Sequence, residues 1–395
     1  MQAEQPLAPE GALLIDRAKQ LASGFKERAD EARRKRTLPS ENIAAMQEAG
    51  FFRSLQPKRW GGYEIHPNDF FAIHRIIGAA CPASGWVLSV VGVHNWQLAL
   101  FPLEAQEDVW AADPRTLIAS SYMPVGKVQK VDGGFSLSGT WGFSSGIDHC
   151  QWVFLGGFVP TSGPRRDMRT FLVPKKDLEV IDDWQVHGLE GSGSKTIKVT
   201  DKFIPFHRTH KFSDGFRQDS PGNEYNNAPL YRIPFGQLFI SAVAANGLSI
   251  LQGAIDTFKV SQKNRIARST HAKVAERPSA QQSIADAAAT LHALTLVQKD
   301  QFSSIMEALE TQKPLQMEDR VRWKSEASRI CRQAKAAIGG LVEASGGSAV
   351  FTKEPIGSYF RDILAAGGHY ANDPYDAASN YGRVLMGGEN QDYFV

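Results

Sequence analysis

The hydrophobic periodicity of this 395-residue chain changes twice along its length, and this change constrains the fold more than any other feature. Residues 10–101 carry apolar side chains at intervals of three to four, which is typical of helices. From about 115 to 210 the apolar runs become short and alternating, and they include the hairpin signal Asp132-Gly133-Gly134. From about 236 to 385 long alanine-rich stretches indicate a helical bundle.

These three segments predict an α+β protein with three domains. We expect an N-terminal helical domain (1–114), a small middle β-barrel (115–212) and a C-terminal helical bundle with a connecting segment (213–395). The expected helices cover residues 10–36, 40–49, 67–80, 83–101, 237–268, 278–310, 317–345, 354–366 and 374–386. The helix over 83–101 is apolar on nearly all sides, so we expect it to be buried.

Composition excludes several classes of function. Lys and Arg number 44 against 42 Asp and Glu, and a net charge of +2 argues against a nucleic-acid-binding protein. Three scattered cysteines give neither a disulfide framework nor the spacing of a metal site, so we expect no metal and a cytoplasmic location. No apolar run is long enough to predict a membrane span, and the first residues do not have the pattern of a signal peptide.

Common catalytic motifs do not identify an activity. The chain has no HExxH pair, no GxSxG elbow and no GxGxxG after a predicted strand. The segment 188–196 contains glycines and a lysine, but the lysine is displaced by one position from the phosphate-loop pattern. Motif scanning alone therefore leaves the question of an enzyme open.

Several blocks, taken with the order of domains, resemble the acyl-CoA dehydrogenase fold. They are Phe51-Phe52 with Trp60-Gly61-Gly62, residues 139–146, residues 188–199 with Phe203-Ile204-Pro205, and Arg265 with Gln281-Gln282. The resemblance covers about residues 10–390. It implies that a flavin lies between the β-domain and the C-terminal bundle.

A second set of blocks resembles one branch of this superfamily, the oxygenase components of two-component flavin-dependent monooxygenases. They are residues 92–96, Ser120-Ser121-Tyr122, residues 141–146 with Asp148-His149, residues 343–346, and residues 369–374. Within this branch the chain is most similar to the enzymes that hydroxylate a phenolic 9,10-seco-steroid in bacterial steroid degradation. It is more distantly similar to the oxygenase component of 4-hydroxyphenylacetate 3-hydroxylase.

The resemblance implies a complete reaction. Reduced FMN or FAD, supplied by a separate NAD(P)H:flavin reductase, would react with O2, and the resulting C4a-hydroperoxyflavin would hydroxylate a phenol ortho to its hydroxyl. A homotetramer is usual in the family. The alternatives are the same chemistry on an indole, another aromatic ring or a heteroatom, and acyl-CoA dehydrogenation. The last needs a carboxylate base, whereas the corresponding turn reads Gly367-Gly368-His369-Tyr370.

On the substrate side, the resemblance implies that His94 meets the phenol oxygen, because a neutral imidazole accepts a proton near neutral pH. Ser120 or Ser121 would orient the same oxygen, and Tyr122 and Trp96 would line the pocket. The alternative for His94 is a core histidine with one hydrogen-bond partner. The alternative for the two serines is an ordinary strand end.

On the flavin side, the resemblance implies that Ser145 contacts flavin N5, with its neighbour Ser144 as the rival, and that His369 lies near C4a. The implied flavin contacts are Trp141, Ser144, Ser145, Arg265, His369 and Asn372, with Arg265 meeting the flavin phosphate of a neighbouring subunit. Ser145 could instead cap a turn before Gly146, and Arg265 could be a surface cation. Asn372 and Asp373 could fix the His369 ring, or Asp373-Pro374 could begin the next helix.

Overall fold

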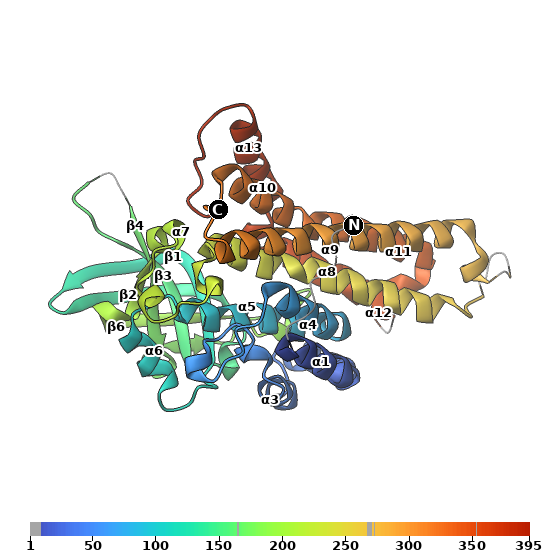
Figure 1. Ribbon diagram of the computed structural model, residues 1–395. Coiled ribbons are helices and arrows are strands. Elements are labelled where there is room, and N and C mark those ends of the chain that lie inside the picture. The colour runs from blue at the N-terminus through green and yellow to red at the C-terminus, as the bar shows by residue number, and fades with distance from the viewer. Residues whose placement is uncertain (1–8, 164–165, 267–270, 272, 353) are drawn as a thin grey trace.

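The computed structural model describes residues 9–163, 166–266, 271, 273–352 and 354–395 (Figure 1). Residues 1–8, which begin the segment examined for a signal peptide, lie outside the described residues. The order of helices, sheet and helices confirms the predicted fold class. The helices of the first part are α1 (Pro9–Glu27), α2 (Ala29–Lys35), α3 (Ser40–Glu48), α4 (Pro67–Ala80), α5 (Pro82–Leu98) and α6 (Leu103–Trp110).

Helix α5 is the central helix of the N-terminal part. All 17 of its residues are buried, as its uniformly apolar sequence predicts. It crosses α4 at Gly85, where an added Cβ would lie 2.5 Å from the Cα of Gly78. Because both positions are glycine, the two helix backbones approach closely and hold α5 in one place.

Two of the predicted helices are each divided into two. Residues 10–36 form α1 and α2, separated at Arg28, whose ψ of 4° departs from helical geometry. Residues 317–345 form α10 (Met317–Ser328) and α11 (Ile330–Ser345), separated at Arg329. The apolar stripe continues across both breaks, so periodicity alone does not reveal an interruption of a single residue.

The middle part is a seven-stranded sheet in the order β5-β6-β2-β1-β3-β4-β7. Its strands are β1 (Ile118–Val131), β2 (Gly134–Ser144), β3 (Trp152–Val159), β4 (Asp167–Pro174), β5 (Glu179–Ile181), β6 (Lys195–Pro205) and β7 (Thr209–Lys211). The predicted hairpin joins β1 to β2, with Val131 opposite Gly134 and Gly133 in the left-handed region at a φ of 72°. The first half of β1 instead runs parallel to β3, with Ile118 opposite Trp152 and Ser121 opposite Leu155.

The C-terminal part is a bundle built around α8. Its helices are α7 (Phe212–Arg217), α8 (Phe235–Gln262), α9 (Pro278–Glu310), α10, α11, α12 (Pro355–Gly367) and α13 (Pro374–Leu385). Residues 267–268 of the predicted helix 237–268 lie outside the described residues. In the described part of the chain, α8 is the one helix long and apolar enough to cross a membrane, and 94% of its most apolar window is buried inside the protein.

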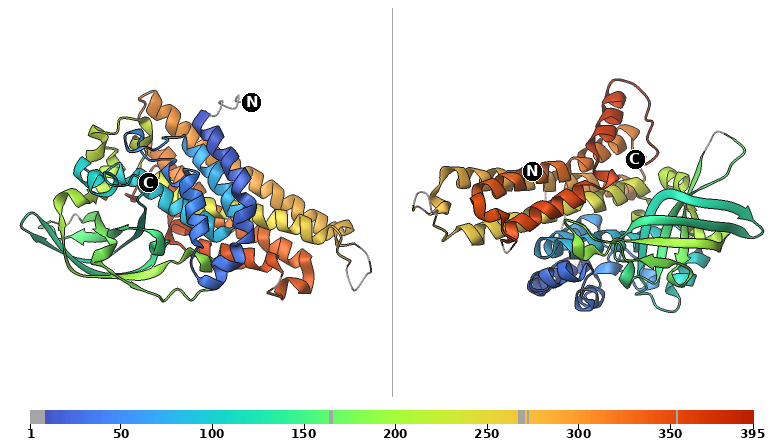
Figure 2. Two further views of the ribbon diagram at one scale, coloured as in Figure 1. Left: turned by 90° about the horizontal axis from the view of Figure 1, so that it is seen from below. Right: turned by 180° about the vertical axis from the view of Figure 1, so that it is seen from behind.

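The three parts meet at one end of the bundle. Figure 2 shows the sheet at this end and the long helices α8 and α9 extending away from it. Helix α5 contacts β1, the start of α8 packs beside them, and the turn between α12 and α13 lies against α8. This junction brings His94, Ser145 and His369 to one region.

Candidate active site

Helix α5 forms a wall shared by both sides of the site. It carries Trp86 near its N-terminus and His94 two turns further on, both buried. At 1.5 Å per residue, the eight-residue separation corresponds to about 12 Å along the helix axis. The two side chains therefore mark two ends of one site.

His94 has one nitrogen bonded and one free. Its Nδ1 lies 2.6 Å from the carbonyl oxygen of Ile118 at the start of β1. A carbonyl oxygen only accepts, so Nδ1 carries the proton and Nε2 has its lone pair available. Nε2 is buried and has no hydrogen-bond partner among the described residues. Burial lowers the pKa of His94 to about 4, so the ring is neutral at pH 7.

Strand alternation separates the two candidate serines. Ser120 shares a face of β1 with Tyr122, whose ring centroid lies 6.0 Å from that of His94. The Ser120 and Tyr122 hydroxyls interact, and the Tyr122 hydroxyl also donates to Gln97 Oε1 on α5. Ser121 points to the opposite face, where its hydroxyl donates to the carbonyl oxygen of Gly142 at 2.7 Å. Ser120 is therefore the serine beside His94.

The turn at the end of β2 presents Ser144 and Ser145 beside α5. It contains a non-glycine residue in the left-handed region, Phe143 at a φ of 62°. Gly146 follows at a φ of 70°, and a Cβ there would lie 3.1 Å from Val87 of α5. Strained backbone of this kind is concentrated at functional sites. The Ser144 hydroxyl is buried without a hydrogen-bond partner in the described part of the chain.

The Ser145 hydroxyl belongs to a chain of buried hydrogen bonds. It accepts from Trp86 Nε1 at 2.9 Å and bonds to the Ser194 hydroxyl at 2.8 Å. Ser194 in turn bonds to the Ser192 hydroxyl at 2.7 Å. Ser145 therefore does more than cap a turn, because it connects α5 to the loop between β5 and β6.

That loop is held by a buried carboxylate of α12. Leu189, in the left-handed region at a φ of 52°, donates its backbone N–H to Asp362 Oδ1 at 2.7 Å. Burial raises the pKa of Asp362 to about 6, while the Arg33 guanidinium 3.7 Å away acts in the opposite direction. Asp362 therefore connects the bundle to the loop that carries Ser192 and Ser194.

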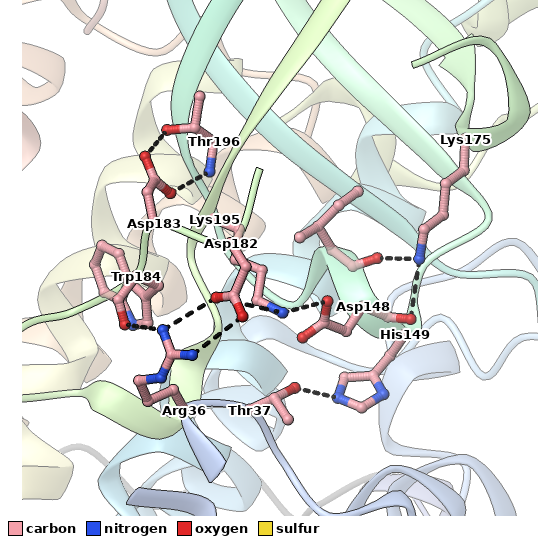
Figure 3. A network of polar contacts seen from close by, with 11 residues as sticks. Arg36, Thr37, Asp148, His149, Lys175, Asp182, Asp183, Trp184, Lys195 and Thr196 are labelled. Carbon is pink, nitrogen blue, oxygen red and sulfur yellow. Dashed lines mark hydrogen bonds and ion pairs between the residues drawn. The ribbon is translucent and has the colours of Figure 1, made fainter. Parts of the chain in front are cut away.

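A network of ion pairs and hydrogen bonds holds the turn that follows β2 (Figure 3). Arg36 donates to both carboxylate oxygens of Asp182, at 3.0 and 3.1 Å, and Lys195 bonds to Asp148 at 3.0 Å. His149 Nε2 bonds to a hydroxyl in the α2–α3 connection at 3.2 Å. The Asp148-His149 block singled out from the sequence therefore anchors the turn to the N-terminal helices.

His369 also has a defined tautomer. Its Nδ1 accepts the backbone N–H of Ala371 at 3.1 Å, so in the neutral ring Nε2 carries the proton and can donate. Burial lowers the pKa of His369 to about 4. The ring centroid lies 6.1 Å from that of Trp86 and 6.0 Å from that of Phe239 on α8. His369 therefore faces the Ser145 end of the site.

Neither side chain proposed to fix the His369 ring does so. Asp373 caps α13 by accepting the backbone N–H of Tyr375 at 2.9 Å, which is the alternative that the sequence left open. Asn372 donates to the carbonyl oxygen of Ala366 at 2.8 Å. Of the two alternatives, the start of the next helix is the one found, and a backbone amide, which no sequence motif marks, holds the ring.

Three other predicted residues present no free polar group to the site within this chain, although Trp96 stacks on Phe235. Trp96 and Trp141 are fully buried, and both indole N–H groups are satisfied by backbone carbonyls, that of Leu230 for Trp96 and those of Met123 and Gly156 for Trp141. Neither indole presents a free polar group to a ligand. Arg265 follows the far end of α8, about 40 Å of helix from the sheet, and donates to backbone there.

Aromatic rings from α7, α8 and the C-terminal segment fill the space between the two sides. They are Phe212, Phe235, Phe239, Tyr370 and Phe394, which pack against one another and against Tyr122. Phe239 bridges the site, since its ring contacts both Tyr122 and His369. These rings make the junction apolar; Phe235 and Phe239 are buried there, whereas Tyr370 is 57% exposed.

Sequence reasoning missed Trp86, Ser192, Ser194 and Phe239. Both aromatic residues lie in runs that are apolar on all sides, so periodicity assigns them to the core. The two serines lie inside the block 188–199 that carries the resemblance, but their spacing alone does not indicate a role. No group of three or more His, Cys, Asp or Glu able to hold a metal occurs among the described residues.

Comparison with known proteins agrees with this architecture. The acyl-CoA dehydrogenase N-terminal domain family matches residues 9–113, and the acyl-CoA dehydrogenase C-terminal domain family matches residues 241–374. These matches define the class of the protein, an acyl-CoA dehydrogenase fold.

Individual relatives narrow the class. The oxygenase subunit HsaA of a flavin-dependent monooxygenase from Rhodococcus jostii is 38% identical over 374 residues, 94% of this chain and 98% of the relative. The oxygenase component of p-hydroxyphenylacetate 3-hydroxylase from Acinetobacter baumannii is 30% identical over 96% of this chain and 90% of its own. The crystal structure of 3-HSA hydroxylase from Rhodococcus sp. RHA1 superposes with a TM-score of 0.93 over 97% of this chain and 99% of its own, at 38% identity. The chain belongs to the oxygenase components of flavin-dependent monooxygenases.

Proposed function

We propose that this protein hydroxylates a phenol ortho to its hydroxyl group, using O2 and reduced flavin delivered by a separate NAD(P)H:flavin reductase. The observation that carries the proposal is the pairing of a buried acceptor nitrogen at His94 with a donor nitrogen at the partly exposed His369. Phenol, O2 and reduced flavin yield a catechol, water and oxidised flavin, which balances both atoms and electrons. The names of the relatives, oxygenase subunit and oxygenase component, support the separate reductase.

The residues present fit a flavin at this junction. The Ser144 hydroxyl and His94 Nε2 are buried polar atoms without partners in the described ranges, as expected where a ligand completes the hydrogen bonding. Ser144 and Ser145 would contact the flavin near N5, His369 would lie at its C4a edge, and Asn372 would support that turn. When bound, reduced flavin would supply the two electrons that activate O2, and O2 would supply the oxygen atom. Either FMN or FAD fits the donor set.

His94 acts on the substrate. Its free Nε2 accepts the phenolic hydrogen, which makes the ring more electron-rich at the ortho carbon. Ser120 and Tyr122 orient the same oxygen, and the surrounding rings exclude water from the reacting atoms. His369 Nε2–H donates a hydrogen bond on the opposite side, where the oxygen atom is delivered.

The position of Arg265 bears on the assembly, and the aromatic wall of the site bears on the substrate. We propose a cytoplasmic homotetramer in which Arg265 reaches the flavin phosphate of a neighbouring subunit, because within one chain it lies far from Ser145. The preferred substrate is a large apolar phenol of the seco-steroid type, since the wall between the two sides consists of aromatic side chains and HsaA is a relative.

An assay with labelled oxygen tests the function. The protein, a flavin reductase, NADH and either FMN or FAD are incubated with a panel of phenols under 18O2. We expect one 18O atom in the product, ortho to the original hydroxyl, and the highest yield with a polycyclic phenol. Incorporation into an indole but into no phenol would replace the substrate class. Anaerobic reduction of bound oxidised flavin by an acyl-CoA thioester would overturn the proposal.

A further inference from the structure

Three serine hydroxyls and one indole N–H form a continuous buried chain at the flavin side of the site. The chain runs from Trp86 on α5 to Ser145 at the end of β2, and then to Ser194 and Ser192 on the β5–β6 loop. Its three hydrogen bonds measure 2.9, 2.8 and 2.7 Å, and all four side chains are buried. Bulk water therefore does not compete for these groups.

One end of the chain has a fixed direction. An indole N–H only donates, so Trp86 always occupies one lone pair of the Ser145 oxygen. Ser145 is left with one further lone pair and its own proton. One of these two is directed at Ser194, and the other is available to a ligand.

The direction of the Ser145–Ser194 hydrogen bond decides which of the two is available. If Ser145 donates to Ser194, it presents a lone pair to the ligand and acts as an acceptor. If Ser194 donates to Ser145, the Ser145 proton is free to point toward the ligand, and Ser145 acts as a donor. Ser192 completes the chain, because its hydroxyl can accept from Ser194 in the first arrangement and donate to it in the second.

Flavin N5 makes opposite demands in its two redox states. Reduced flavin carries a proton on N5 and needs an acceptor, whereas oxidised flavin has a lone pair there and needs a donor. We propose that Ser194, backed by Ser192, is a positioning residue that reverses the Ser145 hydroxyl between acceptor for reduced flavin and donor for oxidised flavin. The inference rests on the proposed function, because it requires flavin N5 to lie at Ser145.

The experiment measures the preference for reduced over oxidised flavin. FMN and FAD, each in both redox states, are titrated anaerobically into the full-length protein, and the ratio of the two dissociation constants is compared between variants. Any loss of correctly folded protein cancels in this ratio. In Ser194→Ala the Ser145 proton has no partner on the loop, so Ser145 acts as a donor. The preference for reduced flavin then falls about three- to tenfold, the contribution of one neutral hydrogen bond.

Three further variants separate the possible causes. Ser194→Thr keeps the hydroxyl and retains the wild-type ratio, and Ser192→Ala shifts the ratio less than Ser194→Ala does. Ser328→Ala removes a buried hydroxyl of α10 that bonds to the carbonyl oxygen of Ser325, and it leaves the ratio unchanged. An equal shift in Ser194→Ala and Ser194→Thr would assign the effect to packing and overturn the inference.

The outcome for Ser145→Ala distinguishes the inference from the proposed function. If Ser145→Ala shifts the ratio and Ser194→Ala does not, the flavin lies at Ser145 but the hydroxyl chain has no role. If neither variant shifts it, flavin N5 is not at Ser145, and the proposed arrangement of the site fails with the inference.

Discussion

The substrate side and the flavin side of the site each contain one histidine, His94 buried and His369 partly exposed, and a backbone contact gives the two rings opposite tautomers. His94 lies against a carbonyl oxygen, that of Ile118, whereas His369 lies against an amide, that of Ala371. Burial lowers both pKa values to about 4, so neither ring is charged at neutral pH. The same residue type therefore becomes an acceptor at one end and a donor at the other, according to the backbone group that it meets.

The largest effect is expected on the substrate side. In His94→Ala the phenol loses its acceptor, so we expect product formation to fall about 10²- to 10⁴-fold, the usual contribution of a general base. Consumption of reduced flavin and O2 continues, and the oxygen appears as hydrogen peroxide. Product is measured by chromatography, and peroxide is measured with a peroxidase-coupled dye.

His74→Ala is the matched control for this variant. His74 is also a buried histidine whose pKa burial lowers to about 4, and it has one bonded ring nitrogen, Nε2 to Asn246 at 3.1 Å, and one without a partner in the described part of the chain, Nδ1, but it lies on α4. The substitution creates a similar cavity, and product per flavin consumed stays at the wild-type value. Equal losses in the two variants would show that His94 has a packing role.

Asp362 holds the loop that carries Ser192 and Ser194 on the flavin side, and the free energy of unfolding of the protein therefore varies with pH. The folded-state pKa of Asp362 is raised from its ordinary value near 3.9 to about 6, so its contribution is fully present below pH 4 and is lost as pH rises through 6. At 1.36 kcal/mol per unit of pKa, the loss amounts to about 3 kcal/mol of unfolding free energy. Asp362→Asn keeps an acceptor for the Leu189 N–H and removes this loss. Urea denaturation at pH 4.5 and pH 7.5 measures the difference.

Asp69→Asn sharpens that test. Burial also raises the pKa of Asp69 to about 6, but this residue lies on α4 and holds no loop of the site. We expect Asp69→Asn to flatten the pH dependence of stability and to leave flavin affinity unchanged, whereas Asp362→Asn alters both because the neutral amide no longer pairs with Arg33. Parallel stability curves for wild type and Asp362→Asn would contradict the assignment.

An intermediate effect is expected at His369. Removal of its Nε2–H donor in His369→Ala lowers product per reduced flavin consumed by about tenfold, the contribution of one hydrogen bond. The His369→Ala and His94→Ala variants then differ in how fast they release peroxide when no phenol is present. His369→Ala accelerates peroxide release without phenol, because the lost contact is to the flavin, and His94→Ala does not. Similar peroxide release in both variants would abolish the distinction between acceptor and donor.

The order of domains and most helices could be predicted from periodicity, because a long apolar stripe can be recognised in the sequence without knowledge of tertiary contacts. The resemblance singled out His94, Ser145 and His369. The tautomers of the two histidines could not be predicted, since each depends on a backbone group that folding brings close. Alternation along β1 already places Ser120, rather than Ser121, on the face of Tyr122. The resemblance implied a pocket role for Trp96 and a flavin contact for Trp141, but it does not show that each indole N–H is already satisfied by backbone carbonyls.

The smallest expected effect is the pH dependence of catalysis, and it tests both histidines together. An imidazole with an ordinary pKa near 6.5 would change its charge in the middle of the working range. With both pKa values at about 4, product per flavin consumed stays constant from pH 6 to pH 9. As pH falls through 4, protonation of His94 Nε2 removes the acceptor. Each neutral ring also contributes stability that is fully present above pH 6.5, and this contribution is lost as pH falls from 6.5 through 4. Measurement of product and peroxide from pH 5.5 to 9 therefore gives a flat profile, and a midpoint near 6.5 would mean that at least one ring is not buried as a neutral group.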